Sequence, residues 1–357
     1  MRLGFGITLN KAYFAVIINN MQLKIHPLKL YLKKPFTIAY GTFYYREAII
    51  VELKDGFYSG FGEATVITYY GKSLAQFMDV LKKHQAFIEA LPLDNPTTFW
   101  QQLYPIFKNH PFILCALDVA AHDLWAKKQQ LSLHQAWQLN LCNLPITNYT
   151  ISIGSIENMI AQMKAYPTPI YKIKLGTKED IAIIKALRAT SDAIFRVDAN
   201  CAWTVEETLK NAIALKELGV EFIEQPLARE NWEGMKILFE ESVLPIIADE
   251  SCQTATDVQK CHQHFHGINI KLMKCGGFTP ALKMIQEAKS LDMKVMCGCM
   301  TETSIGISAI AQLLPLLDYV DMDGALLIKD DPAKGVKIVD GQVIFGVEYG
   351  IGAYLKE

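Results

Sequence analysis

Eight short apolar runs, each ending in a polar residue, recur along the second part of the chain. Stretches with helical patterning separate them, which is typical of parallel strands alternating with helices. The polar residues at the ends of the runs are Thr150, Lys174, Asp198, Glu224, Asp249, Lys271, Cys297 and Asp321. Their successive spacings of 22 to 26 residues each fit one strand, one helix and two loops. Eight such strands predict a closed barrel rather than an open sheet.

The same spacing predicts where a site lies. In a (β/α) barrel, residues at the carboxyl ends of the strands converge on one mouth, although they are far apart in sequence. Gathering several carboxylates and lysines in one mouth is costly unless a cation and a reaction require them. We therefore expect an active site there, in preference to a non-catalytic barrel used for binding.

The three carboxylates come from three consecutive predicted strands. Asp198, Glu224 and Asp249 offer hard oxygen ligands with no histidine or cysteine beside them. Such a set suits Mg²⁺ or Mn²⁺ better than zinc. A role in capping the following helix is reasonable for any one of them but not for all three.

Three lysines complete the predicted constellation. Lys172 and Lys174 lie two apart on one strand, so both side chains point into the barrel. Because neighbouring ammonium groups repel, one of them should lose its proton more easily and act as a base. Lys271 lies across the barrel and faces the opposite side of a bound α-carbon. Lys274 is the competing candidate, but strand parity places it opposite Lys271.

Charge and cysteine content narrow the class of partner. Lys and Arg number 35 against 37 Asp and Glu, so nothing favours nucleic acid or an anionic membrane over a small molecule. The eight cysteines show no disulfide framework and no zinc-like spacing, which indicates a cytoplasmic protein.

Several segments resemble the enolase superfamily in its muconate-lactonizing subgroup. The barrel motifs of that family are similar to YKIKLG, FRVDAN, EFIEQP, IIADES and NIKLMKCGG, and its capping domain is similar to KPFTIAYGT, GFGEA and ALDVAAHDLWAK. The resemblance implies an α/β protein with a (β/α)₇β TIM-like barrel and an α+β capping domain. It also implies one Mg²⁺ per subunit on the three acids, with Mn²⁺ able to replace it. Lys174 and Lys271 would be the acid/base pair, and Lys172 would support Lys174.

We expect four segments along the chain. Residues 1–20 form an N-terminal extension of uncertain role, residues 21–142 the capping domain, and residues 143–325 the barrel. Residues 326–357 form a C-terminal segment that returns to the cap.

The subgroup includes several reactions, and the segment DMDGALL separates them. Its Asp321 and Asp323 are similar to the Asp-x-Asp pair with which dipeptide epimerases hold the substrate's α-ammonium. Paired carboxylates suit a cation and would repel a second substrate carboxylate. The resemblance thus implies an isomerase that epimerises the C-terminal residue of a dipeptide through an enediolate. An o-succinylbenzoate synthase or a cycloisomerase is the alternative.

Further substrate contacts are expected from both domains. Thr150 at the first strand end, and Cys297 and Met300 in CGCMTET, should lie beside the substrate. In glutamate-preferring relatives, the loop after KPF carries an arginine, and Gly41 stands at that position here. Ile38 and Tyr40, with Phe43 and Tyr44, predict an apolar lining for small or hydrophobic residues rather than Glu. Arg46 precedes a strand and is expected to face elsewhere. We also expect a homo-oligomer.

Overall fold

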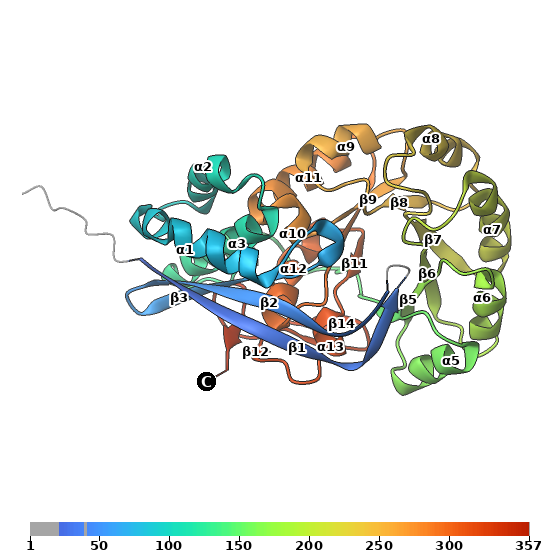
Figure 1. Cartoon of the computed structure of the whole chain (residues 1–357), viewed down its shortest axis with the longest axis horizontal. Coiled ribbons are helices and arrows are strands. Elements are labelled where there is room, and N and C mark those ends of the chain that lie inside the picture. The colour runs from blue at the N-terminus through green and yellow to red at the C-terminus, as the bar shows by residue number, and fades with distance from the viewer. Residues whose placement is uncertain (1–20, 39–40, 357) are drawn as a thin grey trace, which may run out of the picture.

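The computed structural model describes residues 21–38 and 41–356 and shows two parts side by side (Figure 1). Long strands and helices of the first part pack against a barrel formed by the second. The α/β fold with a barrel and a capping domain is therefore confirmed. The expectation for residues 1–20 lies outside the described residues.

The barrel contains eight parallel strands in the order of the sequence. The strands are β4 (Tyr149–Ile151), β5 (Ile170–Lys174), β6 (Ile194–Asp198), β7 (Val220–Glu224), β8 (Ile246–Ala248), β9 (Gly267–Ile270), β10 (Lys294–Gly298) and β11 (Tyr319–Asp321). A parallel bridge between Thr147 and Val320 joins the first strand to the last. Each predicted apolar run forms one of these strands, so the barrel expected from the spacing is correct.

Seven helices follow the first seven barrel strands and cover the outside of the barrel (Figure 1). They are α5 (Ile156–Ala165), α6 (Asp180–Arg188), α7 (Val205–Glu217), α8 (Trp232–Glu241), α9 (Ala255–Cys261), α11 (Phe278–Ser290) and α12 (Ser304–Ala311). Two one-turn helices, α10 (Leu272–Cys275) and α13 (Gly324–Leu327), directly follow strand ends. The connectivity is thus (β/α)₇β.

The capping part consists of an antiparallel sheet and four helices. The sheet contains β1 (Gln22–Ile38), β2 (Gly41–Asp55) and β3 (Tyr58–Thr65). A 3₁₀ turn (Thr68–Tyr70) precedes the helices α1 (Leu74–Ala90), α2 (Pro96–Phe107), α3 (Pro111–Lys128) and α4 (Leu133–Ala136). The hairpin of β1 and β2 reaches across to the barrel (Figure 1), where Ile153 N donates a hydrogen bond to Thr37 O.

Helix α3 differs from its sequence-based interpretation. Its sequence pattern predicts an amphipathic helix with one solvent-exposed face, but 14 of its residues are buried. The helix lies between the cap sheet and the barrel, so nearly every face contacts protein. Asp123 accepts hydrogen bonds from Phe61 N and Ile351 N and pairs with Lys127. Through these contacts Asp123 joins α3 to β3 and to the C-terminal segment.

The C-terminal residues run back to the cap. Strand β12 (Ala333–Lys334) pairs with β15 (Tyr354–Leu355), and β13 (Lys337–Val339) pairs with β14 (Gln342–Ile344). Leu133 N donates a hydrogen bond to Gly350 O. These contacts agree with the division of the chain at residues 142 and 325, which stays a prediction.

Gly62 allows β3 to lie directly on α3. A Cβ atom built on Gly62 would overlap the backbone carbonyl of Ala116. We expect Gly62→Ala to lower the free energy of unfolding by about 2 kcal/mol or more, because neither backbone can move away. Denaturant unfolding measures the change. Gly154→Ala is the matched control, since its Cβ would make ordinary contacts. Equal stability of the two variants would contradict this close packing.

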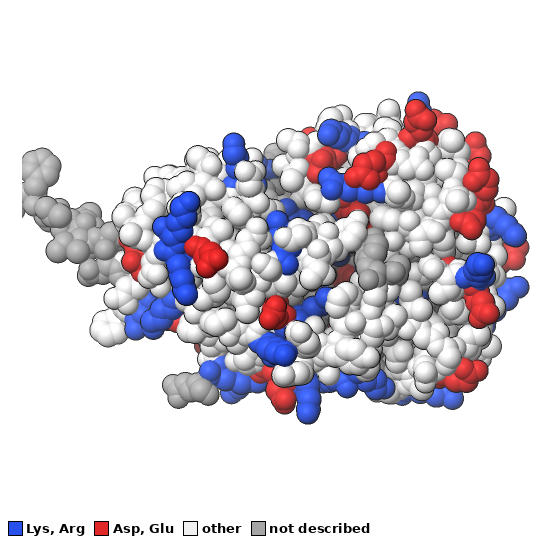
Figure 2. Space-filling view, viewed as in Figure 1, with Lys and Arg blue, Asp and Glu red and all other residues white. Residues whose placement is uncertain are grey.

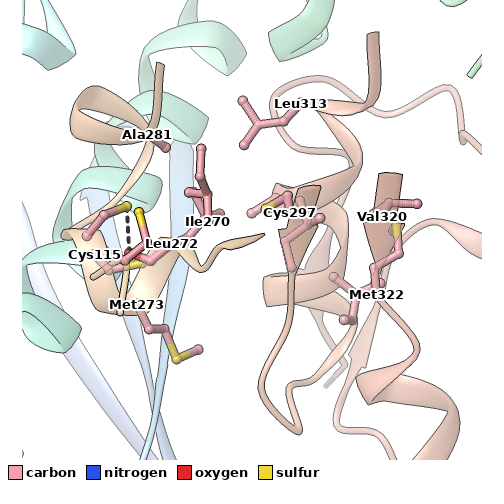
Figure 3. Close-up of a cluster of buried hydrophobic side chains, with 14 of the residues drawn as sticks. Cys115, Ile270, Leu272, Met273, Ala281, Cys297, Leu313, Val320 and Met322 are labelled. Carbon is pink, nitrogen blue, oxygen red and sulfur yellow. Dashed lines mark hydrogen bonds between the residues drawn. The ribbon is translucent and has the colours of Figure 1, made fainter. Parts of the chain in front are cut away.

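The core and the surface are both ordinary for a globular protein. Figure 3 shows apolar side chains from barrel strands, α3 and the helices around them in contact, with Cys115, Ile270 and Val320 among them. Positive and negative side chains are interspersed over the face shown in Figure 2. Among the described residues, no helix is both long enough and apolar enough to cross a bilayer.

Candidate active site

A cavity of about 340 Å³ lies where the β1–β2 hairpin meets the mouth of the barrel. The cap contributes apolar side chains to its wall, including Phe36, Ile38, Phe43 and Ile67. The barrel contributes the charged side chains of Lys172, Lys174, Asp249, Lys271, Asp321 and Asp323. The strand ends therefore meet at one mouth, as their spacing predicts.

The three predicted metal ligands lie together at the base of this cavity. Asp198, Glu224 and Asp249 are buried, and one carboxylate oxygen of each lies within 4.8 Å of the others. Oε2 of Glu224 has the Lys172 ammonium at 2.7 Å but accepts no hydrogen bond of good geometry. Three hard oxygen donors held this closely fit a Mg²⁺ ion and do not suit a softer metal.

Positive charge surrounds these acids. Burial and the nearby Asp198 raise the pKa of Glu224 to about 7. Burial also acts against the carboxylate of Asp249, but Lys271 and Lys274 outweigh it and hold the pKa of Asp249 below its usual range. The three carboxylates therefore concentrate negative charge at one place, and neighbouring cations must balance it.

The charged groups around Lys172 differ from those that the sequence predicts. Its ammonium lies 2.8 Å from Asp321, 2.7 Å from Glu224 and 3.2 Å from Asp198. Burial opposes its charge, but these carboxylates outweigh burial and raise the pKa of Lys172 well above the usual value. The expectation that repulsion between lysines controls this pair is wrong for Lys172, because the acids lie closer and outnumber the lysines.

Lys174 and Lys271 lie on opposite sides of the cavity. They belong to β5 and to the residue after β9, and four steps around an eight-stranded barrel separate these strands. Lys174 Nζ is 2.6 Å from Asp198, and Lys271 Nζ is 2.9 Å from Asp249. Both line the cavity, so a substrate between them would have one ammonium group on each side.

Lys274 is buried beneath the cavity and has other partners. Residues 272–275 turn into helix α10 instead of continuing β9, so the parity argument does not apply to Lys274. Its ammonium donates to Asp249 Oδ1 and to the backbone oxygens of Asp249 and Cys252. Lys274 thus holds the second oxygen of a predicted ligand, which supports the choice of Lys271 as the cavity lysine.

Asp321 and Asp323 lie side by side on the cavity wall, although Asp321 ends β11 and Asp323 directly precedes α13, so they do not share a strand face. A carboxylate oxygen of each lies within 4.8 Å of the other and of the Cys299 sulfur. Asp321 accepts a hydrogen bond from Asn148 Nδ2 at 2.8 Å, and Asp323 accepts one from Thr150 N. Burial and the neighbouring Asp321 raise the pKa of Asp323 to about 7. A cationic group bound here would relieve this repulsion.

The structure corrects the position predicted for Cys297. Its side chain is fully buried in the apolar cluster around Leu313 and Val320 and does not line the cavity (Figure 3). Side chains alternate along β10, so Gly298 faces inward and Cys297 faces outward. Cys299 and Met300, just beyond the strand, line the cavity in its place. Met300 thus lies in the cavity, and its contact with the substrate stays a prediction.

The cap loop agrees with the expected apolar lining in part. Ile38 and Phe43 line the cavity, whereas Tyr44 is exposed. Gly41 begins β2 and pairs with Ile38. Tyr40 lies outside the described residues. The prediction that Arg46 faces away from the cavity is wrong, because Arg46 is buried and lines the cavity.

Two asparagines of the site escaped the sequence analysis. Asn148 donates to Asp321, and Asn269 Nδ2 donates to Glu224 Oε1 at 2.8 Å. Each lies two residues before a predicted site residue, Thr150 or Lys271, and so shares its face of the strand. Strand parity applied one step toward the amino end of each strand would have found both.

Two family models together match most of the chain. One, described as mandelate racemase / muconate lactonizing enzyme, N-terminal domain, matches residues 21–136. The other, described as enolase C-terminal domain-like, matches residues 156–357.

Individual proteins extend the similarity. An L-Ala-D/L-amino acid epimerase from Flavobacterium johnsoniae is 51% identical over 94% of this chain and 100% of its own length. A dipeptide epimerase from Enterococcus faecalis, solved with Mg and L-Leu-L-Tyr, is 32% identical with a TM-score of 0.87 and covers 93% of this chain and 98% of its own. One from Cytophaga hutchinsonii, solved with Mg and D-Ala-L-Val, is 25% identical with a TM-score of 0.89, covering 94% and 96%.

Proposed function

The chain belongs to the mandelate racemase and muconate lactonizing enzyme family of the enolase superfamily, and from this premise we propose that Lys174 and Lys271 exchange the α-proton of a dipeptide. The enzyme is an isomerase, a Mg²⁺-dependent dipeptide epimerase. The observation that carries the assignment of the two lysines is their position on opposite sides of one cavity, beside the acid pair Asp321 and Asp323.

Different site residues bind different parts of the dipeptide. Asp321 and Asp323 bind the α-ammonium of the first residue, since Lys172 pairs with Asp321 alone and Asp323 forms no ion pair within the described residues. Thr150 and Asn148 hold these two acids in place through hydrogen bonds. The C-terminal α-carbon then lies between Lys174 and Lys271. The apolar side chains of the cap contact the side chain of the second residue, which supports small or hydrophobic residues there.

One lysine removes the α-proton from one face and the other lysine returns a proton to the opposite face. Asp198, Glu224 and Asp249 would hold Mg²⁺, which when bound would supply Lewis-acid stabilisation of the negative charge that develops on the substrate carboxylate. Lys172, which contacts Glu224 and Asp321, adds a fixed positive charge on the same side. Inversion follows because the two lysines reach opposite faces.

Proton NMR in D₂O tests the proposal. With Mg²⁺ present, L-Ala-L-Leu, L-Ala-L-Val and L-Ala-L-Ala should lose the α-proton signal of the C-terminal residue and show the signals of the second diastereomer. If no dipeptide exchanges, the proposal is wrong, and the same metal and lysines would then point to the o-succinylbenzoate synthase or cycloisomerase alternative. A homo-oligomer in the cytoplasm is part of the proposal, and analytical ultracentrifugation and cell fractionation test it.

A further inference from the structure

Arg46 is a buried cation in the wall of the substrate cavity. It lies on β2 opposite Leu30 and lines the cavity together with Phe43 and Leu327. Only 7% of the residue is exposed. A guanidinium group in such a position usually has a carboxylate or several carbonyl oxygens around it, because burial of an unpaired charge is costly.

Arg46 lacks such partners within the described ranges 21–38 and 41–356. No carboxylate there forms an ion pair with it, and its Nε atom is buried without a hydrogen-bond acceptor. Its guanidinium group lies over the Phe43 ring, whose centroid is 3.5 Å from the guanidinium carbon. Burial lowers the pKa of Arg46 to about 10, with no acid near enough to offset it.

Arg196 is the other buried arginine among the described residues, and it is paired. Arg196 lies inside the barrel, with Glu221 at 2.7 Å from Nε and the Val320 carbonyl accepting from Nη1. The lysines of the site are likewise matched to acids. The site lysines line the same cavity but are paired with acids, whereas Arg46 lines it without an acid partner among the described residues. Its charge is therefore available to a ligand.

We propose that Arg46 is a specificity residue that binds a side-chain carboxylate of the dipeptide substrate. This inference rests on the proposed function, since it needs a dipeptide in this cavity. An acidic side chain would reach the guanidinium through apolar walls, which accommodate the methylene groups of the side chain. A charge-assisted hydrogen bond would then satisfy the donors of Arg46. The same walls still accept hydrophobic residues.

Gly41 leaves one position of the cap loop without a positive charge. Arg46 comes from a different position, five residues further along the chain, and the fold turns it into the same cavity. Substrates with the acid on the second residue or on the first distinguish which side chain Arg46 binds.

The test compares each acid with its uncharged isostere. The kcat/KM ratio of L-Ala-L-Glu to L-Ala-L-Gln probes the second residue, and the ratio of L-Asp-L-Ala to L-Asn-L-Ala probes the first. We expect at least one ratio to exceed one in the wild type and to fall about 30-fold or more in Arg46→Met. Arg46→Lys should restore part of it, because a positive charge remains. The fall should come mainly from KM.

Lys33→Met is the matched control, since it removes an exposed positive charge from the same sheet. Its two ratios should equal those of the wild type. Ratios that do not differ between wild type, Arg46→Met and Arg46→Lys would overturn the inference. Should Arg46→Met fail to fold, Arg46→Lys and Arg46→Gln supply the comparison. Absence of exchange with every dipeptide, L-Ala-L-Leu included, would instead refute the proposed function.

Discussion

Lys271→Ala should reduce epimerisation by about 10³-fold, the scale expected for removal of a positioned acid or base. Lys271 lies opposite Lys174 across the cavity, so the variant keeps one lysine and loses the group that serves the other face. Lys174 should still exchange the α-proton of one diastereomer with solvent deuterium. That exchange should occur with retention of configuration, because the proton leaves and returns on the same face.

Two measurements separate these effects. Proton NMR in D₂O follows loss of the α-proton from each diastereomer, and polarimetry follows inversion. Lys174→Ala should show the reciprocal pattern, with exchange confined to the other diastereomer. Lys283→Ala, an exposed lysine on α11, controls for loss of positive charge and should behave as the wild type. Continued epimerisation by Lys271→Ala would refute the two-base scheme.

Asp198→Asn should weaken Mg²⁺ binding by about 100-fold or more and reduce activity to background. Asp198 supplies one of three ligand oxygens within 4.8 Å of one another, and it also contacts Lys174 and Lys172. The amide removes one negative charge from the trio and leaves both lysines with a weaker partner. The loss therefore combines lower metal affinity with a displaced base.

Isothermal titration with Mg²⁺ measures the affinity without relying on turnover, and the rise in melting temperature on adding Mg²⁺ provides a second readout. The wild type should bind with one ion per subunit, and its activity should disappear on chelation and return with Mg²⁺. Glu240→Gln, an exposed acid on α8, is the matched control. Unchanged Mg²⁺ affinity in Asp198→Asn would exclude Asp198 as a ligand.

Strand parity explains both the successes and the errors among the predicted site residues. Successive side chains of a strand point to opposite faces. The pattern assigns Asp198, Glu224 and Lys174, at their strand ends, to the face that points into the barrel. On β10 the regular spacing predicts Cys297 as the inward-facing residue. The prediction is wrong by one position, because the Cys297 side chain faces outward into the apolar core. At Lys274 the chain turns into a helix, so parity no longer applies.

The sequence by itself determined the barrel, the acid trio and the opposed lysines, because period-two alternation and a regular repeat are local properties of the chain. The tertiary structure alone decided the pairing of Lys172 with its acids, the burial of α3 and the position of Arg46 in the cavity. Each depends on contacts between segments more than 20 residues apart. Closure of the barrel brings Lys172 to its acids, and the docking of the cap on the barrel buries α3 and places Arg46 in the cavity wall.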